Sequence, residues 1–211
     1  MKDSLKQNIK SSIFYDLIKY IRDRREIILW ENKGKPLTLP SCLKHKTIIR
    51  HGHQFSLKIL IETGTYLGET LWATRKLFDK IFSIEVDRDL FQMGKIRFAK
   101  FPHINIIHGD SGKILGNLLP QINEACLFWL DGHYSGGITG KATLETPITD
   151  ELNHIFNHHI KGHVILIDDA RCFNGQCGYP TISDLHNFVL HTNPNFIFKV
   201  EDDIIRIYQS P

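Results

Sequence analysis

Acidic residues stand at the end of five short apolar runs in this sequence. They are Glu62, Glu85, Asp110, Asp131 and the adjacent pair Asp168 and Asp169. Carboxylates can accept hydrogen bonds from hydroxyl groups, meet an amine or hold a hard cation. Because the carboxyl ends of parallel strands line the ligand crevice of an open sheet, we expect these side chains to share one edge of a sheet. The pattern therefore predicts a small-molecule site.

The first of these runs, LIETGTYLGET from Leu60 to Thr70, is typical of a strand that ends in a glycine turn and opens a helix. A dinucleotide fingerprint, GxGxxG, needs its second glycine so that the backbone can approach a pyrophosphate. Here Tyr66 stands between Gly64 and Gly68, in the place of that glycine. Glu62 adds a negative charge, and no Gly-Lys-Ser/Thr follows to make a P-loop. The turn favours a ligand with an amine, a carboxylate and a ribose but no phosphate.

The next two acidic residues are placed to complete a nucleoside site. Glu85 follows the turn by about 20 residues, the offset at which an acidic side chain meets ribose hydroxyls. Asp110, in the run HGDSGK, is placed to meet an adenine edge. The alternative is that Asp110 only caps a helix and Glu85 only lies at the surface. The ordered set of turn, Glu85 and Asp110 at successive strand ends favours the nucleoside site.

The last three aspartates predict a metal site. Asp131, Asp168 and Asp169 end two further runs, FWLD and ILIDD, and would repel one another without a cation between them. Ligands that are all oxygen favour Mg²⁺, Mn²⁺ or Ca²⁺ over zinc. The alternative is that Asp168 and Asp169 cap loops and pair with Arg171.

A general base is expected beside this metal site. His133 can accept a proton near neutral pH and lies two residues after Asp131, although it could instead contact substrate, and Asp131 itself could take the proton. The glycine-rich run GHYSGGITGK, residues 132–141, follows directly. Its length and position favour a substrate loop over a plain surface connection.

These residues need a sheet to bring them together, and the sequence predicts one. Strands are expected at 58–63, 81–86, 104–109, 126–131 and 163–168, and helices at Glu69–Phe78, Arg88–Ala99, Gly112–Leu119, Asp150–His159 and Ile182–His191. Two final strands, NFIFKV and IIRIYQ, are separated by so few residues that they can only form an antiparallel hairpin. We expect an α/β fold, a Rossmann-like doubly wound sheet of seven mostly parallel strands with a C-terminal antiparallel hairpin.

The first 55 residues do not follow this alternation. A long helix from Ser4 to about Ile28 and a proline-bounded loop precede the basic segment LKHKTIIRHGHQF. This N-terminal helical extension either packs on the sheet edge or serves as an active-site cap or a dimer contact. We therefore divide the chain into an extension, 1–55, and a ligand-binding domain, 56–211.

Composition narrows the class of protein. The chain has 211 residues, 42% of them hydrophobic, and a net charge of +3, which is too small to indicate nucleic-acid or membrane binding. No apolar run approaches the roughly 18 residues of a membrane span. The four cysteines form no zinc spacing, and we expect reduced thiols in a cytoplasmic protein. A homo-oligomer is left open.

The motifs ETGTYLG, SIEVD and GDS together resemble the first three motifs of class I S-adenosylmethionine-dependent methyltransferases. The resemblance covers the chain from Leu57 onward, including the closing hairpin. It implies that Glu62 and the turn around Gly64, with its neighbours Thr65, Tyr66 and Gly68, hold the methionine part of the cofactor. It also implies that Glu85 holds the ribose, that Asp110 and Ser111 hold the adenine, and that Asp131 lies at the cofactor.

The acidic pattern further resembles metal-dependent O-methyltransferases of the catechol and the macrocin (antibiotic-sugar) type. In the sugar-modifying group, an aspartate after the fourth strand and an Asp-Asp pair after the fifth hold the metal, and Asp131, Asp168 and Asp169 match these positions. The catechol enzymes carry a catalytic lysine where this chain has Tyr134. The resemblance implies a Mg²⁺-dependent O-methyltransferase for a small hydroxylated acceptor, such as a sugar or glycoconjugate. The alternatives are a metal-independent methyltransferase and a non-catalytic cofactor-binding protein.

Overall fold

The computed structural model describes residues 13–36, 38–132 and 146–210, and these form an α/β fold. The strands are β1 (Ile59–Thr63), β2 (Lys80–Glu85), β3 (Ile104–His108), β4 (Cys126–Leu130), β5 (Val164–Ile167), β6 (Phe196–Glu201) and β7 (Ile204–Gln209). The helices are α2 (Ile13–Asn32), α3 (Ser41–Gln54), α4 (Glu69–Thr74), α5 (Arg88–Phe98), α6 (Ser111–Leu118), α7 (Ile148–Asn157) and α8 (Ile182–Thr192), with short 3₁₀ turns η1 (Leu119–Gln121) and η2 (Ala170–Cys172).

The strands form one seven-stranded sheet in the order β3-β2-β1-β4-β5-β7-β6. Strands β1 to β5 pair in parallel, and the hairpin β6–β7 joins β5 in the antiparallel sense. Thr63 at the end of β1 is level with Ile84 and with Leu130, and Leu130 is level with Ile167. This register aligns the carboxyl ends of the parallel strands at one edge, and the expected fold class is confirmed.

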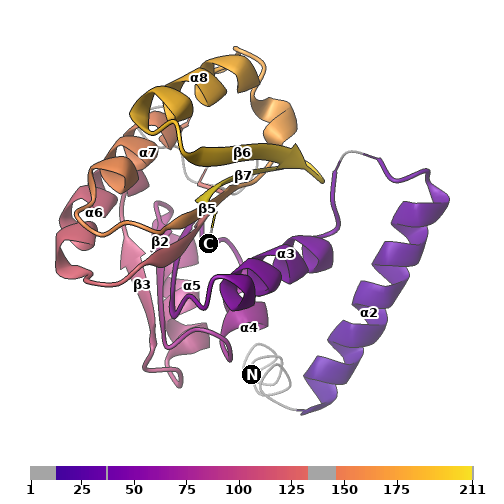
Figure 1. Cartoon of the computed structure of the whole chain (residues 1–211). Coiled ribbons are helices and arrows are strands. Elements are labelled where there is room, and N and C mark those ends of the chain that lie inside the picture. The colour runs from indigo at the N-terminus through magenta and orange to yellow at the C-terminus, as the bar shows by residue number, and fades with distance from the viewer. Residues whose placement is uncertain (1–12, 37, 133–145, 211) are drawn as a thin grey trace.

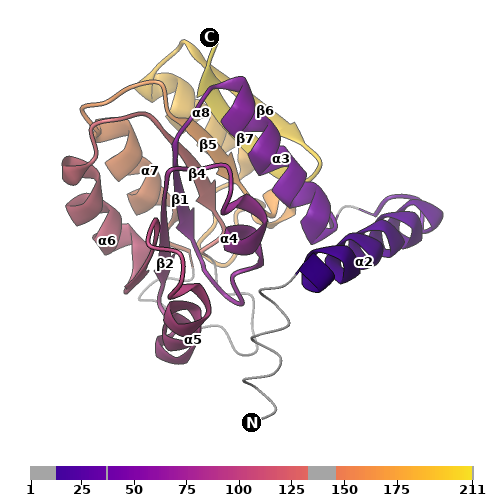
Figure 2. The same cartoon turned by 90° about the horizontal axis from the view of Figure 1, so that it is seen from below.

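Helices cover both faces of the sheet, as the nearly all-apolar strands require. On one face α6, α7 and α8 pack on Phe128 and Leu130 of β4, and on the other α3, α4 and α5 pack on Leu127 and Trp129. Figure 1 shows these two groups of helices on either side of the strands. Figure 2 shows the sheet between these two layers. Successive residues of β4 point to opposite faces, so this central strand is buried on both sides. The sheet is therefore a rigid platform for the edge that carries the acidic residues.

Two expected helices differ in length from the prediction. The helix expected at Glu69–Phe78 ends at Thr74, because the Thr74 carbonyl accepts a hydrogen bond from Leu77 N (2.9 Å), a tighter turn that leads the chain into β2. The helix expected at Gly112–Leu119 becomes α6 followed by the 3₁₀ turn η1, which contains Pro120. Proline has no N–H for an α-helical hydrogen bond, which accounts for this change.

The basic segment forms a helix, α3, that belongs to the core. Ile48 is fully buried against Leu60, Leu127 and other residues of the sheet, so α3 covers a sheet face and not a sheet edge. His45 and His51 are also buried, and burial lowers both pKa values, that of His45 to about 4. These side chains are therefore neutral packing residues. The proposed division of the chain at residue 55 stays a prediction.

Helix α2 lies outside α3 (Figure 2). Much of its apolar surface is exposed. Exposed fractions range from 49% for Ile28 to 60% for Tyr20, and Leu17 and Leu29 lie within this range. Within the described ranges, every helix is too short or too polar to span a membrane. A homo-oligomer stays a prediction.

Candidate functional site at the carboxyl edge of the sheet

The turn between β1 and α4 approaches the end of β4 so closely that glycine is required at its first position. Gly64 has φ +85°, and a Cβ there would lie 2.5 Å from the Asp131 carbonyl oxygen. Asp131 N donates to the Thr63 carbonyl (3.1 Å), which holds the two strand ends together. Gly68 begins α4 with φ +71°, and a Cβ there would lie 2.6 Å from the Phe98 ring. Packing within the protein thus accounts for both glycines of the motif.

A chain of buried hydroxyl and carboxyl groups lies behind this turn. Ser83 Oγ donates to Glu62 Oε2 and also bonds Thr65 Oγ1, each at 2.6 Å. Glu62 is only 1% exposed, and burial raises its pKa to about 8, although hydrogen bonds from Ser83 and Thr70 act in the opposite direction. Glu62 is therefore protonated at neutral pH. A cation beside it would favour the carboxylate form.

Glu85 joins the β1 turn to the end of β2. Its Oε2 accepts a hydrogen bond from Tyr66 N (2.8 Å), and its Oε1 accepts one from Asp87 N (2.9 Å). Glu85 is 4% exposed, so the alternative of a surface role is wrong. A carboxylate has about four acceptor sites. The hydrogen bonds from the described residues use two of them, so two are left for other donors, such as a pair of vicinal hydroxyls. Tyr66 itself is 47% exposed at φ +47°.

Asp110 caps helix α6 at the end of β3. Its Oδ1 accepts from Gly112 N (3.0 Å), and Ser111 is the buried first residue of the helix. The capping role proposed as the alternative is therefore present. It uses one of the two carboxylate oxygens, so the cofactor role of Asp110 stays a prediction.

The predicted metal ligands follow two adjacent strands, β4 and β5. Asp168 N donates to the Leu130 carbonyl (3.0 Å), so the Asp168 backbone lies beside the peptide bond that joins Leu130 to Asp131. Asp169 adopts φ +53° and bonds Arg171 Nη1 through Oδ1 (2.7 Å). The salt bridge with Arg171, which was the alternative to the metal site, is therefore present.

Two further charged residues enter this edge from distant parts of the chain. Asp203, in the β6–β7 turn, accepts from Arg171 N (2.8 Å) and pairs with the Arg171 guanidinium. Lys44, on α3, places Nζ 2.5 Å from Asp168 Oδ2 and 3.3 Å from Asp169 Oδ1. Sequence reasoning identified neither residue, because Lys44 stood in the basic segment of the N-terminal extension and Asp203 in a hairpin turn.

The ligand atoms of the three aspartates do not converge on one point in this arrangement. A magnesium ion needs its oxygen ligands at about 2.0–2.1 Å, so their atoms must converge on one point. In the described part of the chain, Asp131, Asp168 and Asp169 do not form such a group, and two of them already contact the Lys44 ammonium. The magnesium site therefore stays a prediction.

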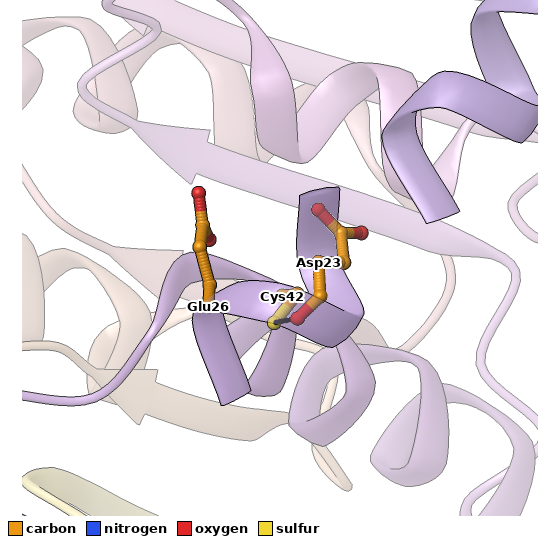
Figure 3. Close-up of side chains that lie close together, drawn as sticks. All are labelled: Asp23, Glu26 and Cys42. Atoms are coloured by element: carbon orange, nitrogen blue, oxygen red, sulfur yellow. Dashed lines mark hydrogen bonds between the residues drawn. The ribbon is translucent and has the colours of Figure 1, made fainter. Parts of the chain in front are cut away.

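One group among the described residues does bring three ligand-type atoms within 4.8 Å of one another, namely Asp23, Glu26 and Cys42 (Figure 3). Asp23 is paired with Lys19 (3.0 Å), and the Cys42 thiol donates to the Asp23 carbonyl (3.8 Å). Burial raises the pKa of Cys42, and the charges of Asp23 and Glu26 raise it further. The thiol is therefore neutral, and the group fastens α2 to α3.

The proposed base, His133, and the glycine-rich loop after Gly132 lie outside the described residues. Glu151 of α7 was missed by sequence reasoning, although it is only 1% exposed and its Oε1 lies 3.4 Å from the position a Cβ would take on Gly132. A carboxylate on the buried face of an otherwise amphipathic helix was the available signal.

No protein-family model matches this chain, and no curated protein sequence matches it. Solved structures do match. An O-methyltransferase from Bacillus cereus in complex with SAH is 11% identical with a TM-score of 0.60, covering 98% of this chain and 97% of that chain. The O-methyltransferase TomG from Streptomyces achromogenes, in complex with SAM, is 15% identical with a TM-score of 0.58, covering 86% of each chain.

A third structure is the methyltransferase MycE of mycinamycin biosynthesis in complex with Mg, SAH and mycinamycin VI. It is 14% identical with a TM-score of 0.54, and the match covers 76% of this chain and 48% of MycE. Identities this low establish the fold alone. The fold is that of class I S-adenosylmethionine-dependent methyltransferases, as the sequence motifs implied.

Proposed function

We propose that this chain, which has the fold of S-adenosylmethionine-dependent methyltransferases, is an O-methyltransferase that acts on a hydroxyl group of a small molecule, such as a sugar or a glycoconjugate. One observation carries the proposal: the parallel register brings the β1 turn, Glu85 and Asp110 to the same sheet edge in the order that one nucleoside would meet them. In an open α/β sheet this edge is where ligands bind.

The proposed cofactor residues divide by the part of the molecule they would hold. They are Glu62, Gly64, Thr65, Tyr66 and Gly68 for the methionine part, Glu85 for the ribose, Asp110 and Ser111 for the adenine, and Asp131 beside the cofactor. The buried Glu62 carboxyl supports this division, because it can balance the charge of an α-amine. The two acceptor sites left on Glu85 match the two hydroxyls of a ribose.

The chemistry asked of the protein is modest, because the methyl group leaves from a sulfonium that is already activated. The acceptor oxygen attacks the methyl carbon, the carbon–sulfur bond breaks, and the hydroxyl proton passes to a base. Holding the two reactants in line and excluding water supplies most of the acceleration. His133 and Asp131 are the proposed bases.

The second candidate function is an O-methyltransferase that depends on a bound magnesium ion. MycE was solved with Mg, and by analogy Asp131, Asp168 and Asp169 would hold magnesium here. The contacts of Lys44 favour metal-independent methyl transfer, because they already place a cation between Asp168 and Asp169. A cofactor-binding protein without catalysis is the remaining alternative.

The proposal is tested by calorimetric titration with S-adenosylmethionine and S-adenosylhomocysteine. We expect micromolar binding that Glu85→Ala weakens by roughly 10-fold or more, since one or two charge-assisted hydrogen bonds are lost. Glu124→Ala, which removes an exposed carboxylate before β4, should bind like the wild type. Transfer of a labelled methyl group to hydroxylated acceptors, with and without EDTA, then separates the catalytic candidates. Absence of cofactor binding would refute the proposal.

A further inference from the structure

The acidic edge is the edge of the sheet that carries Asp131, Asp168 and Asp169 after β4 and β5. Helix α3, which is far from these residues in the sequence, contributes a charged side chain to this edge. Lys44 and Asp168 are separated by 124 positions, yet Nζ and Oδ2 lie 2.5 Å apart. The Asp168 side chain is 1% exposed and that of Lys44 is 16% exposed, so the pair is shielded from water. Ile48, one turn further along α3, is fully buried and fixes the helix on the sheet.

We propose that Lys44 is the resident cation of the acidic edge, where its ammonium takes the place that a divalent metal ion would occupy beside Asp168 and Asp169. The inference rests on the proposed function and deepens it, because Asp131, one of the proposed bases, follows β4 at the same edge. Lys44 is a positioning residue in this scheme. Its ammonium holds the two carboxylates in place at the edge where an acceptor hydroxyl would bind.

Electrostatics support a single occupant. A buried carboxylate is stabilised by a counter-charge held close to it. The Lys44 ammonium supplies that charge, since its Nζ lies 2.5 Å from Asp168 Oδ2 and 3.3 Å from Asp169 Oδ1. A divalent ion on the same oxygens would lie within a few ångströms of this charge and be repelled. Lys44 and a metal ion therefore exclude one another.

The ammonium also has hydrogen-bonding capacity beyond its two carboxylates. A lysine Nζ carries three N–H donors, and the contacts with Asp168 and Asp169 use two. The catechol-type enzymes carry a lysine where this chain has Tyr134. In this chain, the lysine at the acidic edge is supplied by α3 instead.

The matched variants are Lys44→Met and Lys46→Met. Lys46 lies on the same helix but is exposed, so its replacement removes the same charge without reaching the acidic edge. Methionine keeps an unbranched stem of similar length and good helix propensity. Binding of Mg²⁺ and Mn²⁺ is measured by calorimetry for both variants and the wild type. Far-ultraviolet circular dichroism and thermal unfolding check that each protein is folded.

We expect Lys44→Met to bind divalent ions at least about tenfold more tightly than the wild type, because a positive charge beside the ion is removed. Lys46→Met should match the wild type. Equal affinity of Lys44→Met and the wild type, or no detectable site in either, would overturn the proposal. If Lys44→Met fails to fold, Mn²⁺ binding to the wild type is measured by electron paramagnetic resonance. A stoichiometric Mn²⁺ site that is lost in Asp168→Asn would overturn the proposal for Lys44. Absence of such a site in the wild type would support the proposal.

The two proposals fail separately. Loss of cofactor binding in the wild type would refute the methyltransferase function and leave the metal titration interpretable. Turnover adds a further test for Lys44, because a positioning role predicts that Lys44→Met lowers kcat while the KM for S-adenosylmethionine is unchanged. A purely structural role would weaken folding and cofactor binding together.

Discussion

Binding of S-adenosylmethionine should become tighter as the pH rises from about 5.5 to about 7.5, because of Glu62. Burial raises the pKa of this carboxyl to about 8, against the opposing effect of hydrogen bonds from Ser83 and Thr70. The α-amine of the cofactor is positively charged in this pH range. If that amine meets Glu62, the carboxyl must lose its proton on binding, and the cost of losing it depends on pH.

The magnitude follows from the pKa. Below about pH 8, each unit of pH costs a factor of ten in the population of ionised Glu62, or about 1.36 kcal/mol. Two units therefore correspond to about 100-fold in affinity, or about 2.7 kcal/mol. The range ends near pH 7.5 because the cofactor's own amine begins to lose its proton at about pH 8.

The assay is calorimetric titration at both ends of this range in buffers of different ionisation enthalpy. The dependence of the observed enthalpy on the buffer counts the protons released, and we expect about one near pH 6.5. Glu62→Gln is nearly isosteric and cannot ionise, so it should bind weakly, without proton release and with little pH dependence. A wild-type affinity that is constant from pH 5.5 to 7.5, without proton release, would refute the reasoning about Glu62.

Two further predictions concern stability. In urea denaturation, Gly64→Ala should lower the free energy of unfolding by about 1–3 kcal/mol more than Gly34→Ala does. Both glycines have positive φ, but only a Cβ at residue 64 would meet backbone atoms. Equal losses of stability in the two variants would contradict the packing argument. Burial lowers the pKa of His163 from 6.5 to about 4, so the unfolded chain takes up a proton that the folded chain rejects. The stabilising contribution of neutral His163 should therefore be complete above pH 6.5 and should fall as the pH drops toward 4. Urea unfolding at several pH values should show a shallower dependence of the free energy of unfolding on pH in His163→Gln than in the wild type. An equal pH dependence in the two proteins would contradict the prediction.

The sequence by itself determined the sheet and the positions of its acidic residues. Strands β1 to β5 could be predicted because continuous apolar runs between turn residues are a local signal of strands buried on both faces. The short link between β6 and β7 required an antiparallel hairpin. Since parallel strands end at a common edge, Glu62, Glu85, Asp110, Asp131 and Asp168 could be assigned to one side of the molecule before their contacts were known.

Only the tertiary structure decided which charges meet at that edge. Lys44 reaches Asp168 because α3 packs on the sheet through Ile48, and Asp203 reaches Arg171 because the hairpin returns beside β5. No local spacing encodes such contacts between residues distant in sequence. Local patterns specify elements and the faces they bury, whereas the packing of those elements selects the partner of each buried charge.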